Sequence, residues 1–500
     1  MRNLSKSKII AFRQCPKRLW LEVHRQDLKD DSASEIAFAI GNQVGEVAQS
    51  IYDLNQDGYL IEIDKLGWGE AFEKSTTWLA NEEAPLFEAA LKIPGALALA
   101  DVMLPDTNGD QKGWRMIEVK SSTEVKDYHR DDIAIQTYIA QQSGVPLTSV
   151  ALAHIDNTFV YPGEGNYQGL LKEVDLTSEA KERTDEVATW FKEAHAVIEQ
   201  PQEPVVEPGA QCHQPFPCSF CAHCIPEKKQ SDYPLTSFYR LSSHRRDELE
   251  ADGHEDIRKV PAAGLSEINL RIQEQTVKDE AYFDQEGAAA DLAQFPGTAR
   301  FLDFETIVFG VPVWAGTRPY QQLPFQFSLH CLNDSGEIQH HDFLDLTGND
   351  PRPGFATALI EHCGIEGPIF AYNAPFEKRI IRDLVENYPA QATALQAIHD
   401  RVEDLLPIAR KRYYHPSQHG SWSLKAVLPA ICPELSYSVL EEVQDGLKAQ
   451  QAFLEAIEPN TTPIRRNQIN EQLLKYCELD TFALVRMWQT FSNNNQLQNS

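Results

Sequence analysis

The chain has 500 residues, of which 42% are apolar, and its formal net charge is −29. A chain of this length is ample for two separate hydrophobic cores. No apolar run approaches membrane-spanning length, and the N-terminus lacks the apolar core and cleavage site of a signal peptide. We therefore expect a soluble, non-membrane protein in the reducing cytoplasm. The acidic balance argues against a protein that coats polyanions tightly, because such proteins are normally basic.

The first pattern with chemical meaning is a predicted β-hairpin. Asp101 lies in an apolar strand, and the pair Asn108-Gly109 follows it. Both residues of that pair tolerate the positive φ of a tight primed turn. A two-residue turn at this pair places Asp101 opposite Met116 on the second strand.

Side chains alternate along a strand, so this hairpin directs Asp101, Glu118 and Lys120 to one face of the sheet. Two converging carboxylates favour a divalent cation between them, and a nearby lysine can stabilise charge on a phosphate. A predicted helix carrying Gln136 and Tyr138 follows. The alternative for a lone acid, acid, lysine pattern is a half-buried hairpin whose charged residues face water.

Cysteine spacing supplies a second line of evidence. Cys212, Cys218, Cys221 and Cys224 lie within thirteen residues, and Cys15 lies near the N-terminus. In a reducing compartment this crowding indicates a soft metal or an iron-sulfur cluster and argues against disulfides. A structural zinc site made by the four clustered cysteines alone is the alternative. The other four cysteines are expected to be small core residues: Cys331, Cys363, Cys432 and Cys477.

Together these residues resemble the iron-sulfur branch of the RecB-like and Cas4-like nucleases. The resemblance covers residues 1–228 and implies an α/β fold of the restriction-endonuclease, PD-(D/E)XK type. It implies that Asp101 and Glu118 hold Mg²⁺ or Mn²⁺, that Lys120 stabilises the phosphate, and that Gln136 and Tyr138 form the helical motif. It also implies a 4Fe-4S cluster, for which the ligands are Cys15, Cys212, Cys218 and Cys224, with Cys221 as the alternate to one of the late cysteines.

The chain departs from that family in two places. Where the Cas4-like group carries a histidine ligand, this chain has only Gly41-Asn42-Gln43-Val44-Gly45, so one metal ligand is absent or comes from elsewhere. The chain also has four late cysteines, whereas the family uses three.

Residues 229–295 are expected to form a helical connector. Apolar spacing predicts a helix over 239–260 with a break at Gly253, and a second helix over 266–283. The retained apolar spacing indicates that the connector packs against a domain.

The second half carries another set of acids in three separate motifs. Asp303 and Glu305 share one face of a predicted strand, Glu377 follows an apolar strand and a turn, and Tyr476 and Asp480 lie on one face of a helix. Such a set is typical of a two-metal phosphodiesterase. Each piece alone also fits an ordinary strand or a solvated helix.

These motifs resemble the DEDD-type 3′–5′ exonucleases of the RNase H-like fold, over residues 296–500. The resemblance implies that Asp303, Glu305, Glu377 and Asp480 hold two metal ions and that Tyr476 positions the attacking water. Glu377 stands where the family has aspartate, so the reach of the acid is longer by one methylene. The fusion of both halves resembles a class of bacterial proteins, many of which are described only as a domain of unknown function.

Basic residues gather near both sets of motifs. Solvated helix faces and a phosphate track explain either group equally well. We expect weak, salt-sensitive binding to nucleic acid through five residues: Arg13, Lys17, Arg18, Asn373 and Lys378.

The sequence therefore predicts a metal-dependent nuclease with two active sites, acting on DNA that is single-stranded or has ends, in DNA repair or anti-phage defence. RNA is an alternative substrate. Two further alternatives are a binding scaffold in which both sites have decayed, and a protein in which only one site cuts.

Overall fold

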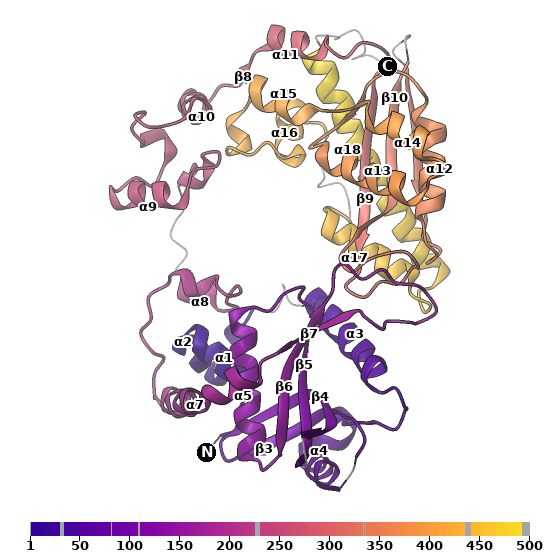
Figure 1. The fold of residues 1–500 in the computed structure, drawn as a ribbon. Helices are drawn as coiled ribbons and strands as arrows, with labels where there is room; N and C mark the ends of the chain where they lie inside the picture. The colour runs from indigo at the N-terminus through magenta and orange to yellow at the C-terminus, as the bar shows by residue number, and fades with distance from the viewer. Residues whose placement is uncertain are drawn as a thin grey trace. The chain divides into compact units, whose positions relative to one another are not determined.

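The computed structural model describes residues 2–30, 35–81, 83–108, 111–225, 231–333, 335, 337–435 and 442–492. Contacts divide the chain into two compact units, each with its own sheet (Figure 1). Both units mix helices and strands, which confirms the α/β class. None of the described helices combines the length and apolar character that a bilayer crossing needs.

The two units follow the expected division of the chain with one difference. The first contains Met1–Glu227 and Phe309–Gln321, and the second contains Lys228–Val308 and Gln322–Ser500. The break after residue 227 lies next to the boundary predicted at 228, and the connector belongs to the second unit. Residues 309–321, which we expected in the second half, belong to the first unit.

Backbone hydrogen bonds and apolar burial explain the place of residues 309–321. The Tyr161 backbone N donates to the Thr317 carbonyl at 2.9 Å, and the Tyr167 hydroxyl donates to the Pro312 carbonyl at 3.0 Å. Val311 is buried in a small apolar cluster with Val44 and other side chains of the first unit. These contacts bind residues 309–321 to the first unit although the chain on either side continues in the second.

The first unit is built on a seven-stranded sheet in the order β2-β3-β4-β5-β6-β7, with β1 paired to β4. Strands β3, β4 and β5 are antiparallel neighbours, and β5 and β6 are parallel. The strands are β1 (Leu4–Ser5), β2 (Tyr59–Leu60), β3 (Leu86–Ile93), β4 (Ala96–Asn108), β5 (Gln111–Lys120), β6 (Leu147–Ile155) and β7 (Leu171–Asp175).

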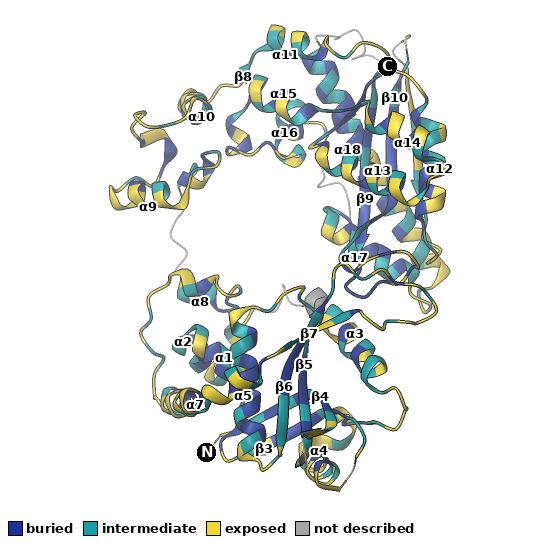
Figure 2. Cartoon of the chain, viewed as in Figure 1, coloured by how far each residue is buried: buried dark blue, intermediate teal, exposed yellow. Residues whose placement is uncertain are grey.

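Helix α5 makes the crossover from β5 to β6 and buries Ile133, Ile135 and Ile139 in the main core of this unit. The buried strand positions are flanked by helices whose outer faces are exposed (Figure 2). The helices are α1 (Lys6–Gln14), α2 (Pro16–His24), α3 (Glu35–Tyr52), α4 (Ile63–Asn81), α5 (Asp127–Gln142), α6 (Thr177–Glu182), α7 (Thr184–Ile198) and α8 (Cys221–Cys224).

The hairpin of β4 and β5 has a register that differs from the prediction. Met116 pairs with Met103, not with Asp101, and Asn108 pairs with Gln111. The pairing therefore differs by two positions from the predicted one, and residues 109 and 110, which include Gly109 of the predicted turn, lie outside the described residues. A shift of two positions preserves the alternation of side chains, so the predicted face survives the wrong register.

The second unit is built on a five-stranded sheet in the order β11-β10-β9-β12-β13. Strands β9, β10 and β11 are antiparallel, whereas β12 runs parallel to both β9 and β13. The strands are β9 (Arg300–Val308), β10 (Gln322–Leu332), β11 (Ile338–Leu344), β12 (Ile369–Ala371) and β13 (Val402–Asp404), and a separate pair is formed by β8 (Tyr282–Phe283) and β14 (Tyr413–Tyr414).

Helix α18 crosses this sheet along β9 and β10 and carries the last predicted motif. The other helices lie around the sheet or in the connector. The helices are α9 (Ser243–Ala251), α10 (Glu267–Lys278), α11 (Gln285–Leu292), α12 (Arg352–Cys363), α13 (Pro375–Asn387), α14 (Ala392–His399), α15 (Leu405–Arg412), α16 (Leu424–Ile431), α17 (Gly446–Ile457) and α18 (Pro463–Phe491).

The connector contains helices and packs against a domain, as predicted, and that domain is the second unit. Helix α9 covers only Ser243–Ala251 of the helix predicted over 239–260 and does not resume after Gly253, which has a φ of +84°, and Ser266 caps the N-terminus of α10. Its Leu249 and Ile272 are buried in the same core as Trp422. The connector is therefore part of a folded unit.

Candidate active sites

Site 1 is the cluster around Glu118 on β5, whose side chain is 1% exposed. Its carboxylate accepts three hydrogen bonds. Lys6 Nζ and Lys120 Nζ lie 2.7 Å and 2.6 Å from Oε1, and Gln136 Nε2 donates to Oε2 at 2.5 Å. The structure thus brings Glu118, Lys120 and Gln136 together as predicted, and it adds Lys6.

Asp101 lies beside Glu118 across the hairpin. Its Oδ2 accepts a hydrogen bond from the Val119 backbone N at 2.7 Å. Burial raises the pKa of Asp101, while the ammonium groups of Lys6 and Lys120 pull it down and Glu88 pushes it up, and the net pKa lies above the ordinary value. The two acids that the sequence assigned to one metal site are therefore neighbours.

The two lysines of site 1 are held in the charged form. Burial alone would lower the pKa of Lys6 and Lys120, but the carboxylates of Asp132, Glu118 and Asp101 outweigh it. The pKa of each ammonium group rises above its ordinary value. Two positive charges therefore lie among the acids of this site.

Asp132 is a member of site 1 that the sequence reasoning missed. Its Oδ2 lies 2.5 Å from Lys120 Nζ, and its other oxygen is buried without a hydrogen-bond partner. It stands four residues before Gln136 on α5, so both side chains leave the same face of the helix. That spacing was a signal that could have identified it.

Glu88 is a second missed member. It is the residue of β3 that falls opposite Asp101, between the pairs Phe87–Val102 and Ala89–Ala100, and it has a φ of +55°. Burial raises the pKa of Glu88 above its ordinary value. The charge of Lys6 opposes this rise, and the charge of Glu118 adds to it. A left-handed backbone inside a strand is rare for a residue other than glycine, and it is enriched at functional sites. No sequence pattern reveals it.

One residue predicted for site 1, Tyr138, is not found there. Tyr138 stacks on Phe191 at 5.7 Å between ring centroids and packs in the apolar core. It lies two residues after Gln136, about 200° around the helix, so the two side chains point in opposite directions. The Gly41–Gly45 segment lies in α3, where Val44 is buried in an apolar cluster and Asn42 and Gln43 are exposed.

The five predicted cysteine ligands line a single pocket. Cys15 lies at the junction of α1 and α2, and the short helix α8 supplies Cys221 and Cys224. The Cys218 backbone N donates to the Cys212 carbonyl at 2.9 Å, which closes the loop between them. All four late cysteines are present, so this geometry does not separate Cys221 from the other three.

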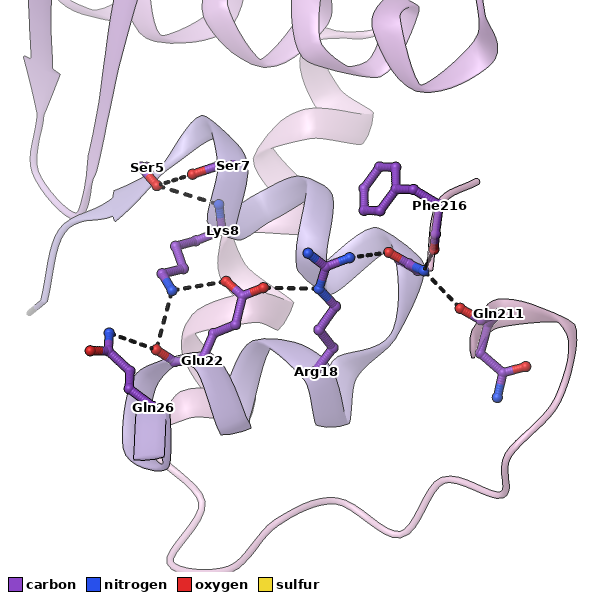
Figure 3. Close-up of polar contacts among 9 residues, drawn as sticks. Ser5, Ser7, Lys8, Arg18, Glu22, Gln26, Gln211 and Phe216 are labelled. Atoms are coloured by element: carbon purple, nitrogen blue, oxygen red, sulfur yellow. Dashed lines mark hydrogen bonds and ion pairs between the residues drawn. The ribbon is translucent and has the colours of Figure 1, made fainter. Parts of the chain in front are cut away.

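A polar network ties this cysteine loop to the N-terminal helices (Figure 3). Gln14 Nε2 donates to the backbone carbonyls of Gln211 and Phe216, at 2.8 Å in each case, and Gln14 Oε1 accepts from the Arg18 guanidinium. Arg18 Nε in turn lies 2.9 Å from Glu22 Oε1. The residue before Cys15 therefore holds the loop that carries Cys212.

The basic residues predicted to bind nucleic acid make internal contacts. Arg13 stacks over Trp190 at 4.2 Å from the ring centroid, Lys17 lies 3.0 Å from Glu203, and Arg18 pairs with Glu22. Lys17 and Arg18 also line the cysteine pocket. These contacts give the three side chains structural roles, and contact with nucleic acid stays a prediction.

Site 2 is a cluster of carboxylates on the second sheet. Asp303 and Glu305 lie on β9 and Asp480 on α18, and one oxygen of each lies within 4.8 Å of the others. Glu305 and Asp480 are buried. The three acids, separated by up to 177 positions in the chain numbering, meet as the sequence predicted.

Crowding changes the proton affinity of these acids. Burial raises the pKa of Asp303 well above its ordinary value, and the charges of Asp480, Glu305 and Glu377 add to the effect. Burial and Asp480 raise the pKa of Glu305 to about 8, although Lys425 opposes the shift. The thiol of Cys477, predicted to be a core residue, is buried 3.7 Å from Asp303 Oδ2.

Glu377 lies close to the other acids but outside their compact trio. It is in the first turn of α13, 3% exposed, and one of its oxygens is buried without a hydrogen-bond partner. Burial raises the pKa of Glu377 to about 8, and Asp404 contributes. A buried carboxylate oxygen with no donor is a feature that a cation ligand would satisfy.

Tyr476 is 5% exposed on the same face of α18 as Asp480. Lys425 Nζ lies 5.4 Å from the centroid of its ring, and the same lysine lowers the pKa of Glu305. Lys425 therefore lies near the predicted water-positioning tyrosine and acts on the charge of Glu305. Lys425 was not among the residues predicted from the sequence.

The remaining predicted residues lie at the end of β12. Asn373 is exposed with a φ of +67°, and its backbone N donates to Asp404 Oδ1 at 3.0 Å. Asp404 also accepts from the Leu406 backbone N at 2.9 Å and so caps the N-terminus of α15. Lys378 is half-buried one residue after Glu377.

A comparison with known protein families matches part of the chain. A family model described as "Domain of unknown function (DUF2779)" matches residues 300–423. The matched segment contains three of the acids of site 2, Asp303, Glu305 and Glu377, and ends before Asp480. A search of the curated proteins found no match to the chain.

Proposed function

We propose that this protein is a metal-dependent nuclease with two active sites that hydrolyse phosphodiester bonds, one in each unit. The observation that carries the proposal is the meeting of Asp303, Glu305 and Asp480 within 4.8 Å. Three carboxylates rarely crowd in a buried place unless cations compensate their charge. The buried, unpartnered oxygen of Glu377 is a second sign that the acids suit a cation.

At site 2, Asp303, Glu305, Glu377 and Asp480 are the residues that would hold Mg²⁺ or Mn²⁺. When bound, such ions generate a nucleophile from water and stabilise charge on the phosphate. Tyr476 would orient the water from its place on α18 beside Asp480, and Lys425 would add positive charge next to Glu305. This is the chemistry of the DEDD-type exonucleases that the motifs resemble.

At site 1, Asp101 and Glu118 are the proposed ligands for one divalent cation, with Glu88 as the extra acid that takes the place of the missing histidine. Lys120 would stabilise the charge that develops on the phosphate during cleavage. Lys6 compensates the acids and holds Glu118, and Gln136 orients Glu118 through its other oxygen. These roles fit a nuclease of the RecB-like type.

The cysteine pocket is proposed to hold a structural 4Fe-4S cluster through Cys15 and three of the four late cysteines. Four thiolates around one tetrahedral zinc lie about 3.8 Å apart. Within the described part of the chain, no three cysteine sulfur atoms lie within 4.8 Å of one another. A zinc ion held by the four clustered cysteines alone is the alternative occupant. When bound, the cluster supplies a covalent link between the two ends of the first unit.

The proposed substrate is single-stranded or end-bearing DNA. The formal charge of −29 opposes tight binding to any polyanion, so affinity should be modest and should fall with salt. RNA is a second candidate for site 2 because nothing in the cluster of acids selects the sugar.

The test is digestion of end-labelled DNA and RNA strands of one sequence with Mg²⁺ or Mn²⁺. Four proteins are compared: the parent, Asp101→Asn, Asp303→Asn and the double variant. Each single change should remove one of two product patterns by at least about 100-fold, because metal ions contribute several kcal/mol to the transition state. Asp342→Asn, at an exposed acid on β11, is the matched control and should cleave like the parent.

Three results would contradict the proposal. Cleavage that survives the double change would show that other residues carry it. A parent protein that binds the strands but cuts neither with either metal would favour the decayed scaffold. A parent that gives a single product pattern, which one of the two single changes removes and the other leaves intact, would be a single-site enzyme.

A further inference from the structure

A second group of metal-ligand side chains lies in the second unit, and the proposed nuclease chemistry does not use it. His330 on β10, His340 on β11 and Glu478 on α18 each offer an atom within 4.8 Å of the others. The two histidines are direct partners across the antiparallel strands, with ring centroids 4.6 Å apart. His340 Nδ1 lies 3.9 Å from Glu478 Oε1.

The other ring nitrogen of each histidine is fixed by a hydroxyl group. His330 Nδ1 lies 2.9 Å from Thr481 Oγ1, and His340 Nε2 lies 2.8 Å from Ser328 Oγ. The two hydroxyl groups are themselves 2.7 Å apart. This leaves Nε2 of His330 and Nδ1 of His340 as ligand atoms. Metal-binding histidines almost always have their second nitrogen held in this way, because the contact sets the tautomer and the ring orientation.

The group is distinct from site 2 although α18 contributes to both. Glu478 lies two residues from both Tyr476 and Asp480, about 200° around the helix, so it leaves the opposite face. The exposed fraction rises from 4% for His330 to 24% for the side chain of His340 and 50% for that of Glu478. An ion from solvent can therefore reach the group past Glu478.

We propose that His330, His340 and Glu478 form a zinc site that fastens the β10–β11 hairpin to α18. Two imidazoles and one carboxylate suit Zn²⁺, whereas Mg²⁺ prefers oxygen ligands alone. Three protein ligands leave a fourth position for water. The site stabilises the helix that carries Tyr476 and Asp480 and is separate from the ions of site 2.

The test is isothermal titration of the metal-depleted, full-length protein with Zn²⁺ alone. Zinc that binds to the cysteines or to site 2 contributes equally in every variant. A difference between variants in the number of bound Zn²⁺ equivalents therefore measures binding at this site alone. His340→Ala and Glu478→Gln should each lose one equivalent of bound Zn²⁺. His341→Ala is the matched control, because His341 is the next residue on β11 and stacks on His362 at 4.5 Å. It should keep the parental stoichiometry.

Ser328→Ala keeps all three ligands, so it should keep the stoichiometry. It should lower the affinity of this site for Zn²⁺ by about 10–100-fold, because the hydroxyl that holds His340 is lost. Equal stoichiometry in the parent, His340→Ala and Glu478→Gln would overturn the proposal, as would the same loss in His341→Ala. If His340→Ala fails to fold, Glu478→Gln decides alone, because its half-exposed side chain is removable without opening the core.

Discussion

The two acidic sites differ in how their charge is balanced. In site 1, the ammonium groups of Lys6 and Lys120 both contact Glu118, within 2.7 Å of one oxygen. In site 2, three carboxylates lie within 4.8 Å of one another, and Lys425 is the cation whose influence on Glu305 is evident. The protein supplies most of the compensating charge at the first site and little of it at the second.

Because of this difference, a divalent ion should have different effects on cleavage and on stability at the two sites. Site 1 is already held together by its lysines, so an ion there should affect cleavage more than stability. Site 2 contains acids whose pKa values lie far above normal, so an ion there should also relieve repulsion and stabilise the fold.

The largest expected effect is on catalysis by site 1. Lys120→Met should lower cleavage by that site about 100–1,000-fold, the cost of removing one preorganised charge at a transition state. Cleavage by site 2 should not change. The matched control is Lys112→Met, an exposed position on the same strand that pairs with Glu83. Equal losses in the two variants would mean that the charge acts through general electrostatics, not at the site.

A pH effect should distinguish the two sites next. Glu305 and Glu377 have folded pKa values of about 8, above the ordinary 4.5. Between these values the folded state binds more protons than the unfolded state, so stability should fall as pH rises from about 5 to 8. For each extra proton bound by the folded state, the free energy of unfolding falls by at most about 1.4 kcal/mol per pH unit.

Chemical denaturation in metal-free buffer at several pH values, followed by a signal from the second unit, measures how the free energy of unfolding changes with pH. Glu305→Gln should flatten it, and saturating Mn²⁺ should flatten it as well, since the ion binds the ionised acids. A slope of the opposite sign, or one that Glu305→Gln leaves intact, would contradict the account of crowding.

Lys6→Met should destabilise the first unit by about 1–3 kcal/mol, because Glu118 is buried and loses one of its donors. Denaturant unfolding measures the change. Mn²⁺ should restore part of the loss by replacing the missing charge. Destabilisation that Mn²⁺ does not reduce would show that Lys6 acts through packing alone.

The smallest effect is expected at Glu377, which lies outside the trio of site 2. Glu377→Asp shortens the arm by one methylene and should change site 2 cleavage by less than about tenfold, that is, by under 1.4 kcal/mol. Single-turnover rates at saturating Mn²⁺ measure it. A loss as large as that of Asp303→Asn would place Glu377 among the essential ligands.

Much of both sites followed from periodicity. The alternation of strand side chains put Asp101, Glu118 and Lys120 on one face even though the register was off by two residues. The helical repeat put Asp480 on the face with Tyr476. The same repeat, applied to Gln136 and Tyr138, would have shown that these two cannot face one site.

The missed residues depend on contacts that a single sequence does not encode locally. Lys6 reaches Glu118, 112 residues later in the chain, from the start of α1, after β1 has paired with β4. Glu88 depends on a left-handed backbone within a strand. The place of residues 309–321 in the first unit likewise results from tertiary hydrogen bonds.

The most direct test of the central claim is diffraction from crystals of the full-length protein soaked in Mn²⁺, with anomalous maps calculated at the manganese edge. The account predicts a peak among Asp303, Glu305 and Asp480 and another beside Asp101 and Glu118. The absence of both peaks at saturating Mn²⁺, in crystals that bind the ion elsewhere, would contradict it.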